Sequence, residues 1–174
     1  GDAWAGMPRL RLAQIDARHQ RWLDVLETLE QLEEEHPAFA LQGELQYLRG
    51  RALAGRGQMR DARACYRQVL GDPKSQGGET AAMAQWMIGE TYFHQGDYSR
   101  ARAAYQKVID EHLHAKWRGR SALQIGQCWE LDAQWEEALK VYETALDFKT
   151  KDPESSAELA SRLRWVRKQT SGVR

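Results

Sequence analysis

The chain has 174 residues, a length typical of one domain, and 42% of them are hydrophobic while 29% are charged. Its 25 lysines and arginines balance 25 aspartates and glutamates, which argues against a protein that binds nucleic acid through bulk positive charge. No run of about 18 apolar residues occurs, so the sequence predicts no membrane span. With 4 prolines and 2 cysteines, the chain fits neither a proline-rich linker nor a disulfide-stapled scaffold.

One pattern recurs along the chain. Three copies carry a glycine, an alanine twelve residues later and a tyrosine four residues after that: Gly50, Ala62 and Tyr66; Gly89, Ala101 and Tyr105; Gly126, Ala138 and Tyr142. The tyrosines lie 39 and 37 residues apart, and a degenerate earlier copy holds Ala13, Val25 and Leu29 at these positions. The period predicts four repeats, at about residues 8–37, 40–73, 79–112 and 116–150, after a lead-in at residues 1–7.

Each repeat is predicted to consist of two helices joined by a tight turn. In the third copy, Ile88 and Tyr92 have the spacing of one helix, and Ala101 and Tyr105 have that of the next. Between them, Gly96 suits a turn with positive φ and Asp97 can cap the second helix. Because one such hairpin cannot bury both of its apolar faces, we expect neighbouring hairpins to stack into a solenoid.

The last predicted element is a capping helix at residues 152–170. Asp152 is the expected N-cap, and Pro153 stands in the first turn, where its missing N–H costs nothing. Leu159, Leu163 and Val166 fall on one face of this segment, with basic residues elsewhere. An apolar face of this kind is typical of the helix that closes a solenoid.

These residues resemble the tetratricopeptide repeat family, whose signature reads W-x2-L-G-x2-Y, then A-x3-F, then P. The best copies are Ile88-Gly89-x2-Tyr92 with Ala101-x3-Tyr105, and Ile125-Gly126-x2-Trp129 with Ala138-x3-Tyr142. The resemblance covers about four fifths of the chain and implies an all-α, right-handed superhelical solenoid of antiparallel helix hairpins. It also implies a non-catalytic scaffold that binds a protein or peptide.

The repeat period is longer than the family's usual one, and the extra residues fall between repeats. Long-period copies of this kind are similar to those of bacterial extracytoplasmic proteins, such as the Tol-Pal-associated periplasmic protein and the lipoprotein of the barrel assembly machinery. The compartment stays open, but this narrower resemblance favours the bacterial periplasm or another extracytoplasmic site over the cytoplasm.

The resemblance also implies a partner-binding groove. In the family, the first helix of each repeat lines the concave surface, and the positions three before and one after the glycine face it. Phe93 and Glu130, three residues further on, are added to this set. In this sequence the expected groove residues are Leu10, Gln14, Tyr47, Arg51, Trp86, Glu90, Phe93, Leu123, Gln127 and Glu130. Aromatic residues beside an arginine are typical of a protein-binding hot spot. Alternatively, residues three before the glycine pack against the next repeat.

No motif predicts catalysis, a cofactor or a metal site. His112 and His114 are close in sequence, but two residues apart on a helix they point in nearly opposite directions. Cys65 and Cys128 occupy positions where other copies hold small or β-branched residues, which indicates packing rather than a nucleophile or a disulfide.

Two other functions stay open. The second repeat is rich in arginine, and these residues form a face that could hold RNA or phosphate. The face comprises Arg49, Arg51, Arg56, Arg60, Arg63 and Arg67. Alternatively, these arginines pair with the acidic helix of the first repeat. The chain begins with Gly1 rather than Met, which indicates a matured protein or a fragment. It is therefore also a candidate for the regulatory or oligomerising segment of a larger protein, and a homo-oligomer stays open.

Overall fold

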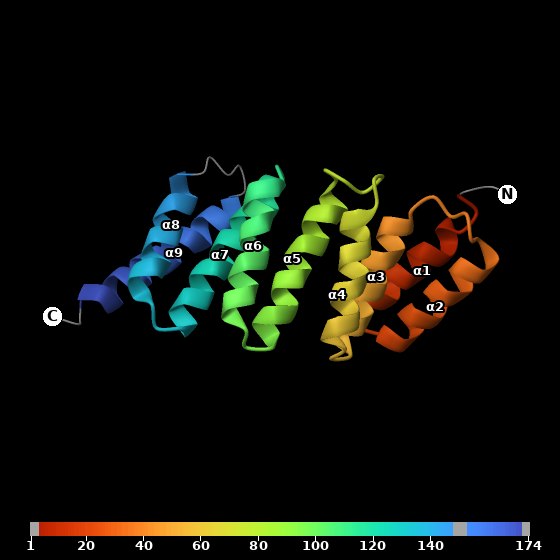
Figure 1. Ribbon diagram of the computed structural model, residues 1–174, viewed down its shortest axis with the longest axis horizontal. Helices are drawn as coiled ribbons and strands as arrows, with labels where there is room; N and C mark the ends of the chain where they lie inside the picture. The colour runs from red at the N-terminus through yellow and green to blue at the C-terminus, as the bar shows by residue number, and fades with distance from the viewer. Residues whose placement is uncertain (1–3, 148–152, 172–174) are drawn as a thin grey trace. The chain divides into compact units, whose positions relative to one another are not determined.

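A computed structural model describes residues 4–147 and 153–171 of the chain. These residues form nine α-helices and no strand (Figure 1). The chain divides into two compact units, Gly1–Met87 and Ile88–Arg174, and the division falls within one helix. In chain order the helices are α1 (Met7–Arg18), α2 (Trp22–Glu35), α3 (Gln42–Gly55), α4 (Met59–Gly71), α5 (Glu79–His94), α6 (Tyr98–Glu111), α7 (Ala115–Leu131), α8 (Trp135–Asp147) and α9 (Pro153–Ser171).

The helices pack against their neighbours in sequence. In the first unit, α1 packs against α2, α3 packs against α4, and α3 also contacts both helices of the preceding pair. In the second unit, α7 packs against α6 and α8, while α9 lies against α7 and α8. None of the described helices is both long enough and apolar enough to cross a membrane.

The turns between paired helices repeat the same backbone geometry. One residue in each turn has positive φ: Gln20 (58°), Gly57 (80°), Gly96 (73°) and Ala133 (55°). In each copy, the next residue's N–H donates to the carbonyl five residues earlier, over 2.8–3.0 Å. This hydrogen bond satisfies one of the carbonyls left open at a helix C-terminus. Glycine adopts the geometry without strain at two of the four sites.

The predicted turn of the third repeat is confirmed at both of its key residues. Gly96 has positive φ, and the Asp97 side chain accepts a hydrogen bond from the Arg100 N–H at 3.0 Å. Asp97 is therefore the N-cap of α6. Asp152, the N-cap predicted for the last helix, lies outside the described residues.

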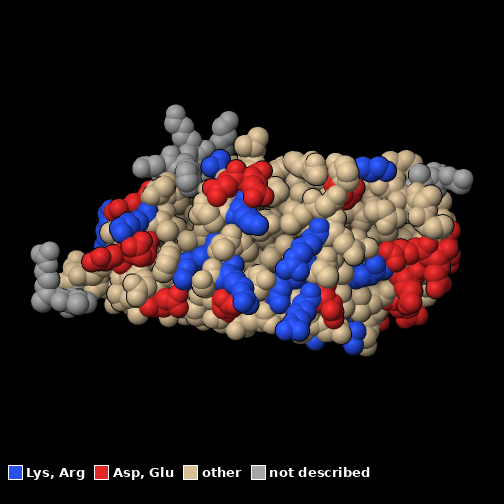
Figure 2. Space-filling model, in the orientation of Figure 1, with Lys and Arg blue, Asp and Glu red and all other residues tan. Residues whose placement is uncertain are grey.

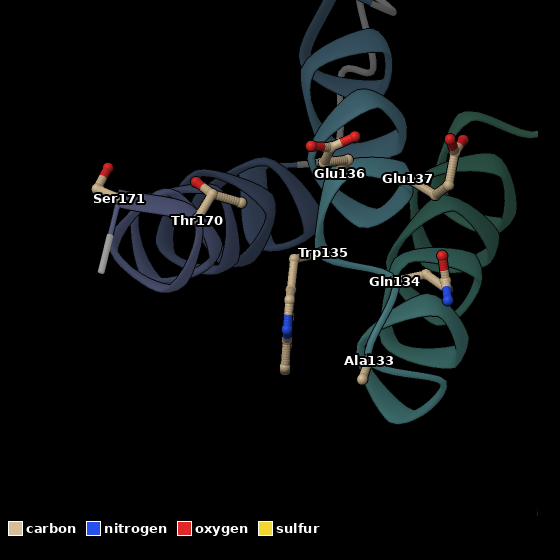
Figure 3. Close-up of a pocket in the computed structure, with 7 residues that line it drawn as sticks. All are labelled: Ala133, Gln134, Trp135, Glu136, Glu137, Thr170 and Ser171. Carbon is tan, nitrogen blue, oxygen red and sulfur yellow. The ribbon is translucent and has the colours of Figure 1, made fainter. Parts of the chain in front are cut away.

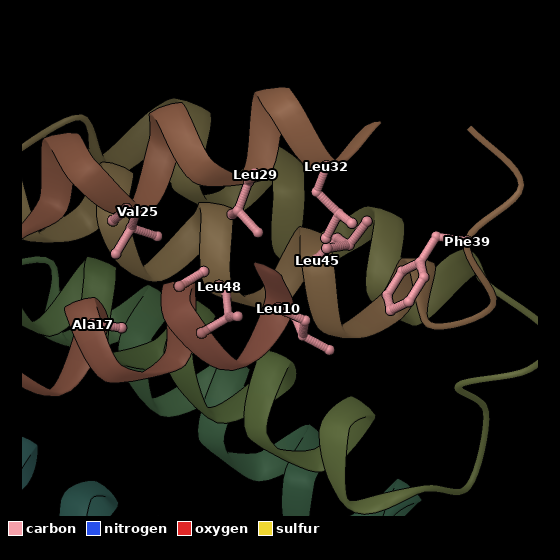
Figure 4. Close-up of a cluster of buried hydrophobic side chains, with 10 residues drawn as sticks. Leu10, Ala17, Val25, Leu29, Leu32, Phe39, Leu45 and Leu48 are labelled. Atoms are coloured by element: carbon pink, nitrogen blue, oxygen red, sulfur yellow. The ribbon is translucent and has the colours of Figure 1, made fainter. Parts of the chain in front are cut away.

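The core of the first unit is built from leucines on three helices (Figure 4). Leu10 of α1, Leu29 and Leu32 of α2, and Leu45 of α3 are each at most 1% exposed. Phe39, from the loop between α2 and α3, closes one end of the cluster and is 2% exposed. Burying a leucine side chain contributes about 1.5–3 kcal/mol, so this cluster is a major source of stability for the unit.

The core of the second unit includes the apolar face of α9. Leu159, Leu163 and Val166 are buried, as the sequence predicts, in a cluster with Leu123 of α7 and Tyr142 of α8. The helix thus covers an apolar surface that α7 and α8 leave open.

Each repeat glycine lies beneath the ring of a buried tyrosine. An added Cβ at Gly50 would stand 2.5 Å from Tyr66 Cε1, and the same clash arises between Gly89 and Tyr105 and between Gly126 and Tyr142. All three tyrosines are 0% exposed. The glycine is therefore required by the tyrosine of its own hairpin, and even a methyl group does not fit there.

Candidate partner-binding surface

The expected groove residues of the first unit divide into buried and accessible ones. Leu10 is 1% exposed within the leucine core, and Tyr47 is 7% exposed with its ring 6.0 Å from that of Tyr66. Gln14, Arg51 and Trp86 are partly exposed. Leu10 and Tyr47 both stand three residues before the repeat glycine position, so in these copies that position packs into the core.

The same division holds in the second unit. Leu123, again three residues before the glycine, is 5% exposed and belongs to the core with Leu163. Glu90, Phe93, Gln127 and Glu130 are partly exposed. The position one residue after the glycine is therefore partly exposed in all four copies, whereas the position four after it ranges from the buried Ala17 to the partly exposed Phe93.

Two glutamates of the expected groove accept hydrogen bonds from the repeat tyrosines. The Tyr105 hydroxyl donates to Glu90 Oε1 at 2.5 Å, and the Tyr142 hydroxyl donates to Glu130 Oε1 at 2.5 Å. Burial raises the pKa of Glu90, against the opposing effect of the Tyr105 hydrogen bond. Sequence reasoning missed these pairs, since the two glutamates stand at different positions after their glycines. A glutamate within one turn of the glycine is the signal that could have found them.

The second repeat lacks this pair. The Tyr66 hydroxyl is buried without a hydrogen-bond partner among the described residues. The positions that correspond to Glu90 and Glu130 hold Arg51 and Ala54 in this repeat, and neither side chain can accept a hydrogen bond from the tyrosine hydroxyl.

This difference predicts opposite results for one substitution at two tyrosines. We expect Tyr142→Phe to lower the free energy of unfolding by about 1.5 kcal/mol, because it removes a hydrogen bond to a carboxylate. Tyr66→Phe should change it by less than about 0.5 kcal/mol or raise it slightly, since the hydroxyl it removes is buried and unpaired. Urea unfolding followed by circular dichroism measures both, and equal losses would contradict the assignment.

Glu130 also forms an ion pair with the last helix. Arg162 Nη1 of α9 lies 3.2 Å from Glu130 Oε2, while Glu130 Oε1 receives the Tyr142 hydroxyl. Both carboxylate oxygens of Glu130 are therefore engaged within the unit, and its side chain is 9% exposed. Nearby, Arg102 stacks over the Trp129 ring, 3.6 Å from its centroid, and pairs with Asp132 at 2.5 Å.

The arginine face of the second repeat is partly used within the fold. Arg49 makes two hydrogen bonds to the Glu33 carboxylate of α2, at 3.0 and 2.6 Å, and Arg63 is 7% exposed. Figure 2 shows the acidic side chains gathered over α2. The predicted pairing with the acidic helix is confirmed at Arg49. The remaining four arginines, Arg51, Arg56, Arg60 and Arg67, are at least partly exposed.

The groups considered for chemistry are buried or dispersed. Cys65 and Cys128 are free and buried, and burial raises the pKa of Cys128 to about 12, which keeps its thiol protonated at neutral pH. His112 is 8% exposed at the end of α6, and burial lowers its pKa. Within the described ranges, no group of three or more His, Cys, Asp or Glu side chains is placed to hold a metal ion.

A cleft that sequence reasoning did not anticipate lies in the second unit. It is bounded by residues 133–137, at the start of α8, and by Thr170 and Ser171 at the end of α9. In Figure 3 the Trp135 side chain extends away from the Glu136 and Glu137 carboxylates. Its ring meets that of Trp165 edge to face, 5.6 Å between centroids, and Trp165 is 43% exposed. Trp165 of α9 thus packs against Trp135 of α8.

Comparison with known proteins supports the repeat assignment. Residues 47–115 match the family described as tetratricopeptide repeat. No curated protein matches the chain.

Solved structures with a similar fold cover nearly the whole chain. A double mutant of MamA from RS-1 is 17% identical with a TM-score of 0.62, over 99% of this chain and 98% of that one. A MamA structure from residue 41 to the end, from Desulfovibrio magneticus RS-1, is 18% identical with a TM-score of 0.62, over 99% and 94% of the two chains. A putative kinesin light chain from Podosopora anserina with nearly identical TPR-like repeats is 17% identical with a TM-score of 0.60, over 94% and 95%.

At these identities the similarity concerns the fold. The family match covers the second and third copies, and the structural similarity extends over the other helices. Residues 47–115 therefore match the tetratricopeptide repeat family, and the described part of the chain has an all-helical fold similar to that of the solved structures with such repeats.

Proposed function

We propose that the chain is a non-catalytic interaction module that binds a peptide segment, or a partner protein through such a segment. The binding residues lie on the first helix of each repeat, at its accessible positions. The tetratricopeptide repeat fold supports a protein-interaction scaffold in general, and proteins of this family are typically non-catalytic interaction modules. Binding a segment to a preformed surface costs the module little ordering free energy.

One observation carries the proposal. Positions after the repeat glycines hold a mixture of aromatic, amide and charged side chains that are partly exposed: Gln14, Arg51, Glu90, Phe93 and Gln127. Glu130 belongs to the same set of positions, but its side chain is 9% exposed and pairs with Arg162. Trp86, three residues before its glycine, is partly exposed as well. Large apolar groups beside polar ones are typical of protein-binding hot spots. Leu10, Tyr47 and Leu123 are buried and are therefore not available to a partner.

The test uses a displayed library of random peptides selected on the whole chain. Selected peptides are then measured by fluorescence anisotropy against Phe93→Ala and Gln127→Ala, two accessible positions of the second unit. We expect Phe93→Ala to weaken binding about tenfold or more, as loss of an aromatic anchor does.

Leu113→Ala is the matched control, because Leu113 is 91% exposed in the loop between α6 and α7 and is not a repeat surface position. Circular dichroism confirms that each variant is folded. Peptides that bind all variants equally, or a library that yields no binder, would contradict the proposed surface.

The alternative ligand is RNA or phosphate, bound by the arginine face of the second repeat. Arg49 is engaged by Glu33 and Arg63 is buried, so two of its six arginines are unavailable to such a ligand.

A further inference from the structure

Glu90 is a partly buried carboxylate that receives one hydrogen bond, from Tyr105, and is close enough to His94 for an electrostatic interaction. Its carboxylate is partly buried on α5, and its hydrogen bond with a described residue is the one that Oε1 receives from Tyr105. No ion pair joins Glu90 to any residue that the structure describes. Removing a carboxylate from water is costly unless a cation or several donors replace the lost hydration.

The fourth repeat shows how the same arrangement is completed. There the Tyr142 hydroxyl also donates to Oε1 of a glutamate, and the second oxygen of that glutamate, Glu130 Oε2, meets the guanidinium of Arg162 at 3.2 Å. The arginine comes from α9, the helix that follows the repeat. Glutamate, tyrosine and arginine therefore form a three-membered group in the fourth repeat, and among the described residues the third repeat has the glutamate and the tyrosine.

Phe93, close to Glu90 on α5, offers an aromatic ring against which the methylene groups of a basic side chain can pack. Phe93 stands three residues after Glu90, so the two side chains lie on the same side of the helix. Phe93 is partly exposed, and its ring lies 5.6 Å from that of Tyr98. An arginine whose guanidinium pairs with a carboxylate can lay its methylene groups or its planar head against such an aromatic ring.

We infer that the Glu90–Tyr105 pair is a recognition site for a basic side chain, an arginine above all, presented by the bound partner segment. The partner's arginine would take the place at Glu90 that Arg162 takes at Glu130. The inference rests on the proposed function and specifies the partner. The partner segment has a basic residue that pairs with Glu90, and next to it an apolar residue that packs against Phe93. Selection for a basic residue follows from charge complementarity at a partly desolvated carboxylate.

The experiment extends the peptide selection with a double-mutant cycle. We expect peptides selected on the unaltered chain to be enriched in arginine or lysine at one position. Replacing that arginine by citrulline, its neutral isostere, should weaken binding about tenfold. On the Glu90→Gln variant, which keeps an oxygen to accept the Tyr105 hydrogen bond, the same replacement should have less than a twofold effect.

Glu136→Gln is the control, because Glu136 is an exposed carboxylate of the same unit at the start of α8 and lies outside the repeat surface positions. It should leave the citrulline effect unchanged. Peptides that depend on Phe93 but show no basic preference, or a citrulline effect equal in the unaltered chain and Glu90→Gln, would overturn this inference and leave the proposed surface intact. Peptides that ignore Phe93, Gln127 and Glu90 alike would overturn both.

Discussion

Leu29→Ala is expected to lower the free energy of unfolding of the first unit by about 3 kcal/mol. Leu29 of α2 is 0% exposed, in the cluster with Leu10, Leu32 and Leu45. Truncation to alanine loses the transfer free energy of the buried methyl groups and leaves a cavity that surrounding helices fill only partly. The loss is a large fraction of the stability of an ordinary domain.

The control for this substitution lies on the same helix. Leu23, near the start of α2, is 65% exposed, so Leu23→Ala removes the same atoms from a position already in water. We expect it to change stability by less than about 0.5 kcal/mol. Urea unfolding gives both values, and hydrogen exchange of the amides in α1, α2 and α3 locates the effect. Similar losses for the two variants would contradict the assignment of Leu29 to the core.

Gly50→Ala is expected to cost about 2 kcal/mol, although alanine is the better helix former by about 1 kcal/mol. The new Cβ would stand 2.5 Å from Tyr66 Cε1 and 2.8 Å from Cδ1, and the Tyr66 ring is 0% exposed, with little room to move away. Overpacking therefore outweighs helix propensity at this position.

Gly71→Ala is the matched control, since Gly71 is the last residue of α4 and an added Cβ would meet nothing within 4 Å. This variant should be neutral or more stable by about 0.5 kcal/mol. A second test combines Gly50→Ala with Tyr66→Leu. If the ring is the cause of the loss, the double variant is less destabilised than the sum of the two single ones. An additive result, or a stabilising Gly50→Ala, would show that the packing explanation is wrong.

The local features of the repeat were predictable because they depend on residues close together in sequence. Gly96 adopts the positive φ, Asp97 caps the next helix, and the apolar face of the last helix is buried. Each of these results depends on backbone preference or on helical spacing over a few residues.

The repeat register could be predicted from the sequence, but the exposure of each residue in it could not. The register identifies which residues stand near the repeat glycine, but it does not show how deep each side chain lies. Trp86 and Tyr47 occupy the same repeat position, yet Trp86 is partly exposed and Tyr47 is buried. The depth of a side chain depends on what the neighbouring helices place against it, as the Tyr66 ring does against Tyr47.

The sequence by itself determined that this protein is a helical repeat with a period near 38 residues, because the periodicity of small and aromatic residues reports helix pairing directly. Only the tertiary structure decided which charged side chains form ion pairs within the fold. Arg162 pairs with Glu130, 32 residues away in sequence, and Arg49 pairs with Glu33, 16 residues away. Glu90 instead accepts a hydrogen bond from Tyr105. These pairings form between separate helices, where the distance between two charged groups is set by packing and not by their separation along the chain.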